Sequence, residues 1–556
     1  MSAPDVKEAG SPQLESVDEA NAIIQGGVSD AEALMSAWTK KSLIAAYVSV
    51  FLIFFIDSFQ QETTGSLSPY VTSAFKDHAL LSTTSVLTSI IGGVAKLPIA
   101  RIIDVWGRPE GFVLMTLLCT LGLILMASCR NIETYAAAQV IYWLGYNGRE
   151  YVLHVFLSDT TDLVNRAFVW GIASTPYIAT TFAGPAAAQR FYKDGALWWG
   201  FGTFAIITPV ISAPIVVLFW QTRRKAYEMG LVQKRQNGRT WFESIKYYFV
   251  QFDGIGLVLI TAAFNLVLLP LTLASSQASK WRSADIIAMI VIGGICFITF
   301  AIWERYGAQV TFIPFRLLAD RTLLGSCFSA FSWDLYFSSY LQVVFDQTIR
   351  NAGYMVNIYT IGSCFWSVPL GIMIRKAGRF KWFALAAMPI MFLGAGLMIY
   401  FRYPSSGIGY VVMCEIFKAF AGGALVICSE MAAMASGKHE NIAVAYALVG
   451  LFSRIGMSIG SSVSGAIWSN TLPGELRKNL PEGSKDKAAA IYGSLAVALS
   501  YPVGSAVRDA IIKSYAVAQR RMLITGVSIL PLAVVAILMW RDIRLKETKQ
   551  LKGTVF

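Results

Sequence analysis

The sequence predicts an all-α polytopic membrane protein with about fourteen transmembrane helices. Of its 556 residues, 55% are hydrophobic and 14% are charged, whereas soluble domains have about 45–50% apolar and about 25% charged residues. The apolar residues come in blocks of about 20, the length that crosses a bilayer as a helix. A short motif near the second block also recurs near the tenth. Together these observations exclude most classes of soluble protein.

The chain opens with a polar, acidic segment, residues 1–41, which we expect to be a disordered cytosolic tail. Apolar blocks follow it to the end of the chain. Twelve spans remain an alternative if one weak pair of blocks, such as the seventh and eighth, lies on the surface. The predicted spans are 42–60, 83–103, 111–129, 134–157, 167–188, 197–220, 254–275, 284–304, 322–345, 353–374, 381–401, 408–434, 441–468 and 521–540.

The distribution of basic residues predicts the orientation in the membrane. An even number of spans places both termini on one side, and cytoplasmic loops retain Lys and Arg. The strongly basic loop 221–253 therefore indicates the cytosolic side, with both termini in the cytosol. The net charge of +12 follows largely from this topology, so no nucleic-acid partner is expected. The lipid bilayer is therefore the expected surrounding partner, and the charge distribution leaves open whether the membrane is the plasma membrane or an endosomal one.

An internal repeat predicts how the spans are grouped. The segment from Ala100 to Arg108 after the second span resembles the segment from Gly371 to Arg379 after the tenth. Two parallel halves of this kind are a transporter architecture. We therefore expect two six-helix bundles separated by two extra helices, with a long outer loop in the second bundle and a cytosolic tail after it: 42–220, 254–304, 322–540, 469–520 and 541–556.

The repeated segment resembles the loop signature of the major facilitator superfamily, with Ala100 in place of its first Gly. Glycine allows a tight turn between spans, and Asp and Arg can pair at a helix end and hold one conformation. An ordinary cytosolic turn with a solvated ion pair is the alternative. The candidate latch residues are Asp104, Gly107, Arg108, Arg375, Gly378 and Arg379.

The fifth span carries Gly171, Gly184 and Pro185, which resemble the Gly-Pro signature of the proton-coupled fourteen-helix branches of that superfamily. Glycine permits close contact between helices, and proline kinks them. The thirteenth span has small residues at the equivalent place, Gly456 and Gly460. Close packing without a role in coupling is an equally open interpretation.

Charged residues inside spans are a sharper indication of function, because each is costly in the bilayer unless it faces a cavity or a partner. Burial raises the pKa of a carboxylate and an adjacent Arg lowers it, so such groups can hold a proton during transport. A static structural pair is the alternative, for Arg149 with Glu150 and for Glu415 with Lys418. The candidates for proton coupling are Asp57, Glu150, Asp334 and Glu415; Lys96, Arg454 and Glu430 also fall inside spans.

Polar and aromatic residues gather on the fourth, ninth and tenth spans, where a central cavity is expected. On the fourth span Gln139, Tyr142, Tyr146 and Arg149 follow helical spacing and form one stripe. Aromatic residues in spans often face lipid instead. The candidate substrate-binding residues are Tyr142, Tyr146, Arg149, Trp333, Tyr336, Tyr340, Tyr359, Trp366, Lys418 and Tyr501.

The seven Cys and three His show no ligand spacing, so we expect no metal site, no disulfide framework and no cofactor. No nucleophile, base and orienting residue converge at a recognisable spacing either, so the chain is not expected to be an enzyme. A transporter of bare metal ions would need ligands along its pathway, so transport of bare metal ions is not expected.

Two motifs carry a more specific resemblance. The run Asn147-Gly-Arg-Glu-Tyr151 lies on the fourth span, and Tyr-Pro-x-Gly-Ser-x-x-Arg-x-Ala-Ile-x-x-x-Tyr-x-x-Ala-Gln-Arg begins at Tyr501. With the fourteen-helix layout, they resemble the fungal siderophore–iron transporters of the major facilitator superfamily. The second motif also predicts a helix with an apolar face, which could dock over the outer mouth or form a cap without ligand contact.

This resemblance implies uptake of ferric siderophores, mainly hydroxamates, across the plasma membrane together with protons. It also implies that the outer loop takes part in uptake. We expect a monomer that works by alternating access. A drug:proton antiporter on the same scaffold is the main alternative, and a non-transporting nutrient receptor is a lesser one.

Overall fold

The computed structural model describes most of the chain and leaves both termini and several connecting segments aside. Among the described residues every regular element is a helix, so the expected all-α fold is confirmed. Asp104, Trp333 and Asp334 lie outside the described residues. The structure describes residues 37–74, 81–96, 98–99, 102, 106–230, 243, 246–247, 249–250, 253–274, 280–308, 320–327, 335–435 and 442–545.

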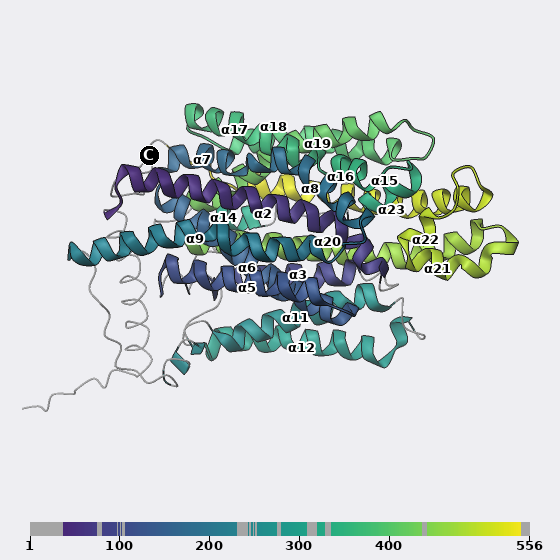
Figure 1. The fold of residues 1–556 in the computed structure, drawn as a ribbon, viewed down its shortest axis with the longest axis horizontal. Helices are drawn as coiled ribbons and strands as arrows, with labels where there is room; N and C mark the ends of the chain where they lie inside the picture. Colours follow the sequence, from purple (N-terminus) through teal and green to yellow (C-terminus); the bar gives the residue numbers. More distant parts are fainter. Residues whose placement is uncertain are drawn as a thin grey trace, which may run out of the picture.

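The long helices run roughly side by side and give the molecule two ends (Figure 1). We call one of them the tail end, because α2 begins there at Lys40 and the described chain finishes there at Leu545. The opposite end carries the short helices α21 and α22, and we call it the cap end. These names imply no direction across a membrane.

The N-terminal half consists of helices α2 to α9. Helix α2 packs against α8 and α9, and α5 packs against α6 and α9. Gly122 and Gly145 let α5 and α6 approach closely, because a methyl group on either would collide with the backbone of the other helix. The helices are α2 Lys40–Ala74, α3 Leu81–Val94, α5 Arg108–Ser128, α6 Ile132–Asp159, α7 Leu163–Ser174, α8 Pro176–Lys193 and α9 Trp199–Glu228.

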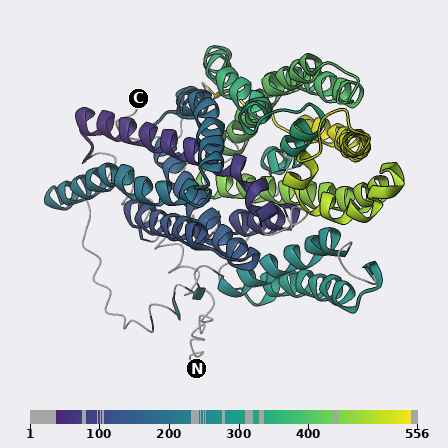
Figure 2. The same ribbon diagram turned by 45° about the vertical axis from the view of Figure 1, so that its right-hand side comes forward.

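Two helices lie beside the main bundle, α11 Gly254–Leu273 and α12 Ala284–Tyr306 (Figure 2). Helix α11 packs against α3 and α20, and α12 packs against α11. Both are long and apolar enough to cross a membrane, and α12 buries little of its surface in the protein. These properties favour the prediction of two extra membrane helices over the surface alternative.

The C-terminal half consists of helices α14 to α23. Helix α19 packs against α17 and α18, and α23 packs against α18 and α20. The helices are α14 Arg321–Cys327, α15 Phe337–Val344, α16 Ile349–Val356, α17 Ile358–Ala377, α18 Lys381–Phe401, α19 Ile408–Ala435, α20 Ile442–Asn479, α21 Ala488–Gly493, α22 Leu495–Leu499 and α23 Ala506–Leu538, with a 3-10 turn, η5, at Glu482–Lys487.

Residues 469–520, expected as an outer loop, are mostly helical. Helix α20 continues to Asn479, and α23 begins at Ala506, well before the predicted span at 521. The element between them, η5 with α21 and α22, forms the cap. The predicted apolar face on this part of α23 is buried: Ile511, Tyr515 and Ala518 are all fully enclosed. The two flanking helices therefore extend past the predicted spans and hold a structured cap.

The other predicted spans differ from the observed helices mainly where a helix breaks or extends. The fifth span is two helices, α7 and α8, which meet at Pro176, because proline lacks the amide hydrogen that would continue the helix. The first span continues past residue 60 to Ala74. Ten helices among the described residues are long and apolar enough to cross a membrane.

The two halves meet most extensively along α3 with α20, α7 with α17, and α8 with α16. Gly371 on α17 faces the backbone of α7, where an added methyl group would lie 2.9 Å from the Cα of Phe168. Gly353 on α16 faces Pro185, where it would lie 2.6 Å from the proline Cβ. Glycine is thus what allows the halves to touch at both places.

Candidate substrate site

A cavity of about 360 Å³ lies between the two halves, nearer to the cap end. Its walls come from α2, α3, α5 and α6 in the N-terminal half and from α15, α16 and the adjoining residues in the C-terminal half. Hydroxyl, amide and aromatic side chains dominate the lining. The lining residues are Gln61, Glu62, Thr64, Gly65, Ser66, Ser68, Pro69, Thr88, Met126, Gln139, Tyr142, Trp143, Leu335, Ser338, Gly353, Val356 and Asn357.

Hydrogen bonds to consecutive glutamines of α2 hold the aromatic wall of the cavity in place. The hydroxyl of Tyr142 donates to the Oε1 of Gln60 over 2.6 Å. The hydroxyl of Tyr177 donates to the Oε1 of Gln61 over 2.6 Å, and Tyr146 donates to the same oxygen over 3.2 Å. Of the predicted substrate-binding residues, Tyr142 lines the cavity, and Tyr146 contacts a residue that lines it.

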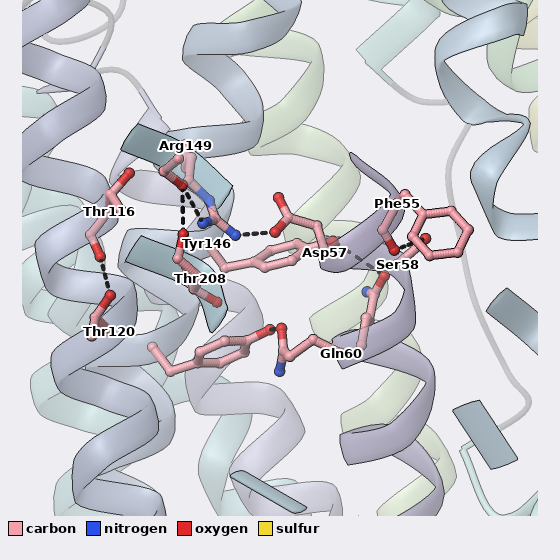
Figure 3. Close-up of polar contacts among 12 residues, drawn as sticks. Phe55, Asp57, Ser58, Gln60, Thr116, Thr120, Tyr146, Arg149 and Thr208 are labelled. Atoms are coloured by element: carbon pink, nitrogen blue, oxygen red, sulfur yellow. Dashed lines mark hydrogen bonds and ion pairs between the residues drawn. The ribbon is translucent and has the colours of Figure 1, made fainter. Parts of the chain in front are cut away.

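Arg149 and Asp57 form a buried ion pair one helical turn from Gln61, toward the tail end. The guanidinium of Arg149 on α6 donates to the Oδ1 of Asp57 on α2 (Figure 3). It also reaches the hydroxyl of Ser212 on α9 over 3.4 Å. Both side chains of the pair are almost fully enclosed, at 1% and 4% exposure. The structure therefore pairs Arg149 with Asp57. The sequence had suggested a different structural partner for Arg149, the adjacent residue Glu150.

Glu62 connects the two halves across the cavity. Its Oε2 accepts a hydrogen bond from the Nδ2 of Asn357, which lies between α16 and α17. A second contact of this kind lies nearer the cap end, where the hydroxyl of Tyr70 donates to Gln342 of α15. These two hydrogen bonds join α2 to the C-terminal half on the cap side of the ion pair.

A second group of charges lies between the halves on the tail side of the cavity. The guanidinium of Arg454 on α20 donates to the Oδ1 of Asn147 on α6. The ammonium of Lys96 lies 5.7 Å from the ring centre of Tyr446. Glu430 on α19 is within electrostatic range of both Lys96 and Glu150. Charged residues from α6, α19 and α20 and from the segment just after α3 therefore meet where the two halves touch.

The C-terminal half holds its own buried charges away from the cavity. The ammonium of Lys418 and the guanidinium of Arg402 both reach the Oε1 of Glu415, over 2.9 Å and 3.4 Å. Arg402 also lies over the ring of Phe337 at 3.9 Å and donates to Gln519 of α23 over 3.2 Å. This arrangement joins α18, α19 and α23, and none of these side chains belongs to the cavity lining.

The remaining aromatic candidates occupy several places. Tyr336 and Tyr340 are buried inside the C-terminal half, where Tyr336 stacks on Trp468 at 4.2 Å between ring centres. The hydroxyl of Tyr359 faces Gly422 of α19. Trp366 packs against Phe420, and Tyr501 lies half-buried in the cap. None of these five lines the cavity, and their roles in substrate binding stay predictions.

The candidate latch residues are at the tail end. Arg108 pairs with Asp159 at the end of α6, with 3.1 Å between Nη2 and Oδ2. Arg379 pairs with Asp542 beyond α23, over 2.9 Å. Gly107 and Gly378 both have positive φ, at 111° and 68°, which glycine adopts most readily.

Arg375 is exposed on the last turn of α17. Each of the two described ion pairs therefore connects segments of the same half: Arg108 with Asp159 in the N-terminal half, and Arg379 with Asp542 in the C-terminal half. A role of the latch residues in holding one conformation stays a prediction.

Sequence reasoning did not single out Glu62 and Asn357, which line the cavity, or Tyr177, which bonds to Gln61 of the lining. The first span is predicted to end at residue 60, which leaves Glu62 outside it, whereas α2 continues to Ala74. The signal that could have found it is that Glu62 is the one charged residue between Gln61 and Ser73, so little interrupts the span. Among the described residues no group of three or more His, Cys, Asp and Glu is placed to hold a metal ion.

The long apolar helices, the two halves and the cavity between them define the architecture of a membrane transporter. The family model of the Major Facilitator Superfamily matches residues 50–461. In structure, the chain resembles a bacterial homologue of the lysosomal transporter Spinster, with a TM-score of 0.50 over 90% of this chain and 97% of that one. The identity is 14%, so this likeness concerns the fold alone.

Several fungal transporters are similar to the chain over almost its whole length. It is 47% identical to MFS siderochrome iron transporter 1 of Ajellomyces capsulatus, over 99% of this chain and 95% of that protein. It is 43% identical to MFS siderochrome iron transporter D of Aspergillus fumigatus, over 96% and 90%. Siderophore iron transporter mirB of Emericella nidulans is 39% identical, over 96% and 90%. The chain belongs to the Major Facilitator Superfamily and, within it, to the fungal siderophore–iron transporter family.

Proposed function

We propose that the protein imports ferric siderophores of the hydroxamate type together with protons, by alternating access. The observation that carries this proposal is the cavity between the two halves, lined by hydroxyl, amide and aromatic groups. The names of its relatives, siderochrome and siderophore iron transporters, support the same substrate class.

The charge of the lining supports hydroxamates among the known chemistries of iron chelation. Three hydroxamates, each with one negative charge, neutralise Fe³⁺, whereas three catecholates leave an excess of negative charge. The cavity walls offer hydrogen-bond donors and acceptors such as Gln61, Gln139 and Ser338, and no Arg or Lys belongs to the described lining. A neutral, oxygen-rich chelate suits such a surface, because its exposed oxygens and amides find partners without a fixed positive charge.

The contacts between the halves support alternating access. On the cap side of the cavity, α16 touches α8, and Glu62 bonds to Asn357. On the tail side, α17 packs against α7 through Gly371. Opening one set of contacts while keeping the other would expose the cavity to one side at a time, which is the hinge-like motion of such transporters. We propose that the cap end faces the outside and that both termini are cytosolic.

Proton entry supplies energy for accumulating the chelate. One proton moving down a potential of about 100 mV contributes about 2.3 kcal/mol, and each pH unit adds about 1.4 kcal/mol. We propose that Glu150 or Asp57 carries the proton. Asp57 is paired with Arg149 close to the cavity, and Glu150 is adjacent in the chain to Arg149 and lies near Lys96 and Glu430. Protonation at either carboxylate changes the charge balance beside the interface between the halves.

Replacing Glu150 tests the proton coupling. Glu150→Gln keeps the size of the side chain and removes its ability to give up a proton, so uptake driven by an imposed pH gradient should be lost. Uptake of labelled ferric chelate into vesicles with and without the gradient measures this. Glu133→Gln, in the exposed first turn of the same helix, is the matched control and should retain gradient-driven uptake. Normal gradient-driven uptake by Glu150→Gln would exclude Glu150 as the proton carrier and leave Asp57, for which Asp57→Asn is the same test.

The substrate class and the direction of transport need a separate measurement. Cells that express the protein should accumulate a labelled ferric hydroxamate chelate above the level of cells without it. Resistance to amphipathic drugs without accumulation would instead favour a drug:proton antiporter. Binding without flux in proteoliposomes would favour a receptor.

A further inference from the structure

The charge inside the cavity has a single sign. Among the described residues that line it, Glu62 is the one with a charged side chain, and the others are polar, aromatic or apolar. The nearby basic residues have partners of their own: Arg149 pairs with Asp57, and Arg454 donates to Asn147. A bound ligand therefore meets one carboxylate and no basic side chain of the described lining.

Glu62 is held firmly at this position. Gly184 of α8 lies directly against it, since a methyl group at Gly184 would collide with the Cβ of Glu62. The next residue, Pro185, touches Gly353 of the C-terminal half. The Gly-Pro pair of the fifth span thus fits between the base of the Glu62 side chain and the opposite half.

The carboxylate has one partner that a ligand can replace. Asn357 donates a neutral amide hydrogen to it from the opposite half. An ammonium group is a stronger partner for a carboxylate than a neutral amide, because it adds the attraction of a full opposite charge to the hydrogen bond, and this attraction grows where water is excluded. A cationic group on the ligand would therefore compete well with Asn357 for Glu62.

We propose that Glu62 is a specificity residue that selects iron chelates by net charge, favouring a chelate with a free ammonium group over a neutral one and excluding anionic chelates. This inference rests on the proposed function and names the substrate class within it. The ammonium takes the place of Asn357 on the carboxylate, so binding of the preferred ligand also releases one of the contacts between the halves. A carboxylate on the ligand would face Glu62 without a compensating basic side chain.

Three ferric chelates that differ only in the charge of one terminal group test the inference. They are the iron complex of a linear tris-hydroxamate with a terminal amine, its N-acetyl derivative and its N-succinyl derivative, which carry a positive, neutral and negative terminus. For the wild-type protein we expect KM for uptake to rise in that order. The step from ammonium to acetyl should be about tenfold, the loss of one charge-assisted hydrogen bond. In Glu62→Gln, the ratio between those two KM values should fall to near one.

Two further variants separate charge from structure. Glu133→Gln removes a carboxylate from the exposed first turn of α6, outside the cavity, and should keep the wild-type ratio. Asn357→Ala removes the donor but keeps the carboxylate, so it should keep or increase the preference for the ammonium chelate. Equal KM values for the ammonium and acetyl chelates in the wild type would overturn this inference but not the proposed function. So would a ratio of those two KM values that is the same in Glu62→Gln as in the wild type. Uptake of none of the three chelates by the wild type would overturn the proposed function and this inference with it.

Discussion

Single charged residues inside the bundle are placed where a partner from another helix can reach them. Arg149 and Asp57 are 92 positions apart in sequence and meet in a site that water does not reach. Both pay a large cost of desolvation, and their mutual attraction offsets it only while both are present. The sequence indicated both residues, because charges inside spans are rare. It did not indicate their pairing, because helical spacing relates residues within one helix and not between two.

Removing one member of this pair should destabilise the protein. Arg149→Met leaves Asp57 buried and unpaired, which typically costs about 3–5 kcal/mol. Thermal unfolding of the detergent-purified protein should therefore shift to a lower temperature, and the double variant with Asp57→Leu should recover part of the loss.

Arg190→Met, in an exposed pair with Asp194, is the matched control. It should change the free energy of unfolding by less than about 1 kcal/mol. An Arg149→Met protein that unfolds at the wild-type temperature would show that the pair contributes nothing to stability.

At the scale of elements, the cap is the part of the structure that departs furthest from a simple bundle. It is held by Arg508 at the start of α23, whose side chain is 1% exposed. The guanidinium donates to the carbonyl of Ala498 in α22 over 2.8 Å and to the carbonyl of Gln342 in α15 over 3.3 Å. On the other side of the cap, the amide of Leu495 donates to the hydroxyl of Ser73 in α2 over 3.4 Å. The cap therefore contacts both halves.

Loss of the Arg508 side chain should loosen the cap. Arg508→Met leaves the carbonyls of α22 and α15 without this donor, so η5 and α21 should become more accessible to protease. Trypsin added to intact cells should then cut faster at Lys485 or Lys487 than in the wild type, as followed by immunoblotting.

Arg520→Met, an exposed position on the same helix, should leave the cleavage rate unchanged. Because lysine lacks the planar fork that reaches two carbonyls at once, Arg508→Lys should restore little of the protection. A wild-type cleavage rate in Arg508→Met would mean that other contacts hold the cap.

At the scale of the whole molecule, the two halves touch on both sides of the cavity through close glycine contacts. Gly353 allows α16 to approach Pro185 on the cap side, and Gly371 allows α17 to approach α7 on the tail side. Gly353 lies against the ring of Pro185, and Gly371 lies against the backbone of α7. A methyl group added at either glycine should weaken the contact between the halves on that side of the cavity. It should therefore favour the conformation in which the cavity is open to that side.

The two glycines should therefore have opposite effects on access to the cavity. A reporter, Gln139→Cys, places a thiol on the cavity wall, and a membrane-impermeant thiol reagent is added from outside. Gly353→Ala should raise the rate of labelling, because it weakens closure on the cap side. Gly371→Ala should lower it, because it favours opening toward the tail side.

Gly396→Ala is the control, because nothing lies within 4 Å of a methyl group added there, and it should leave labelling unchanged. The same direction of change in both test variants would contradict alternating access about this cavity.

The sequence could predict much of the fold and a smaller share of the site. The positions of the spans, the two extra helices and the buried face before the last span follow from apolar composition and helical spacing, which are local properties. Tyr142, Tyr146 and Arg149 stand out in the same way, as a polar stripe on one helix; Tyr142 lines the cavity, and a part in substrate binding stays a prediction for all three. Glu62 was missed because apolar composition falls off gradually along α2, so the predicted span ends at residue 60 although the helix continues to Ala74.

Apolar composition and the repeated motif are enough to predict a chain that crosses a membrane many times and has two related halves, because a bilayer demands long apolar helices and a repeat leaves its motifs in the chain. Which polar groups meet is visible in the folded protein and not in the chain. Asp57 joins Arg149, Glu62 joins Asn357, and Tyr336 and Tyr340 lie in the core of one half instead of the cavity wall. The physical reason is that the composition of a helix decides whether it enters the membrane, whereas its rotation and its neighbours depend on packing against helices far away in the sequence.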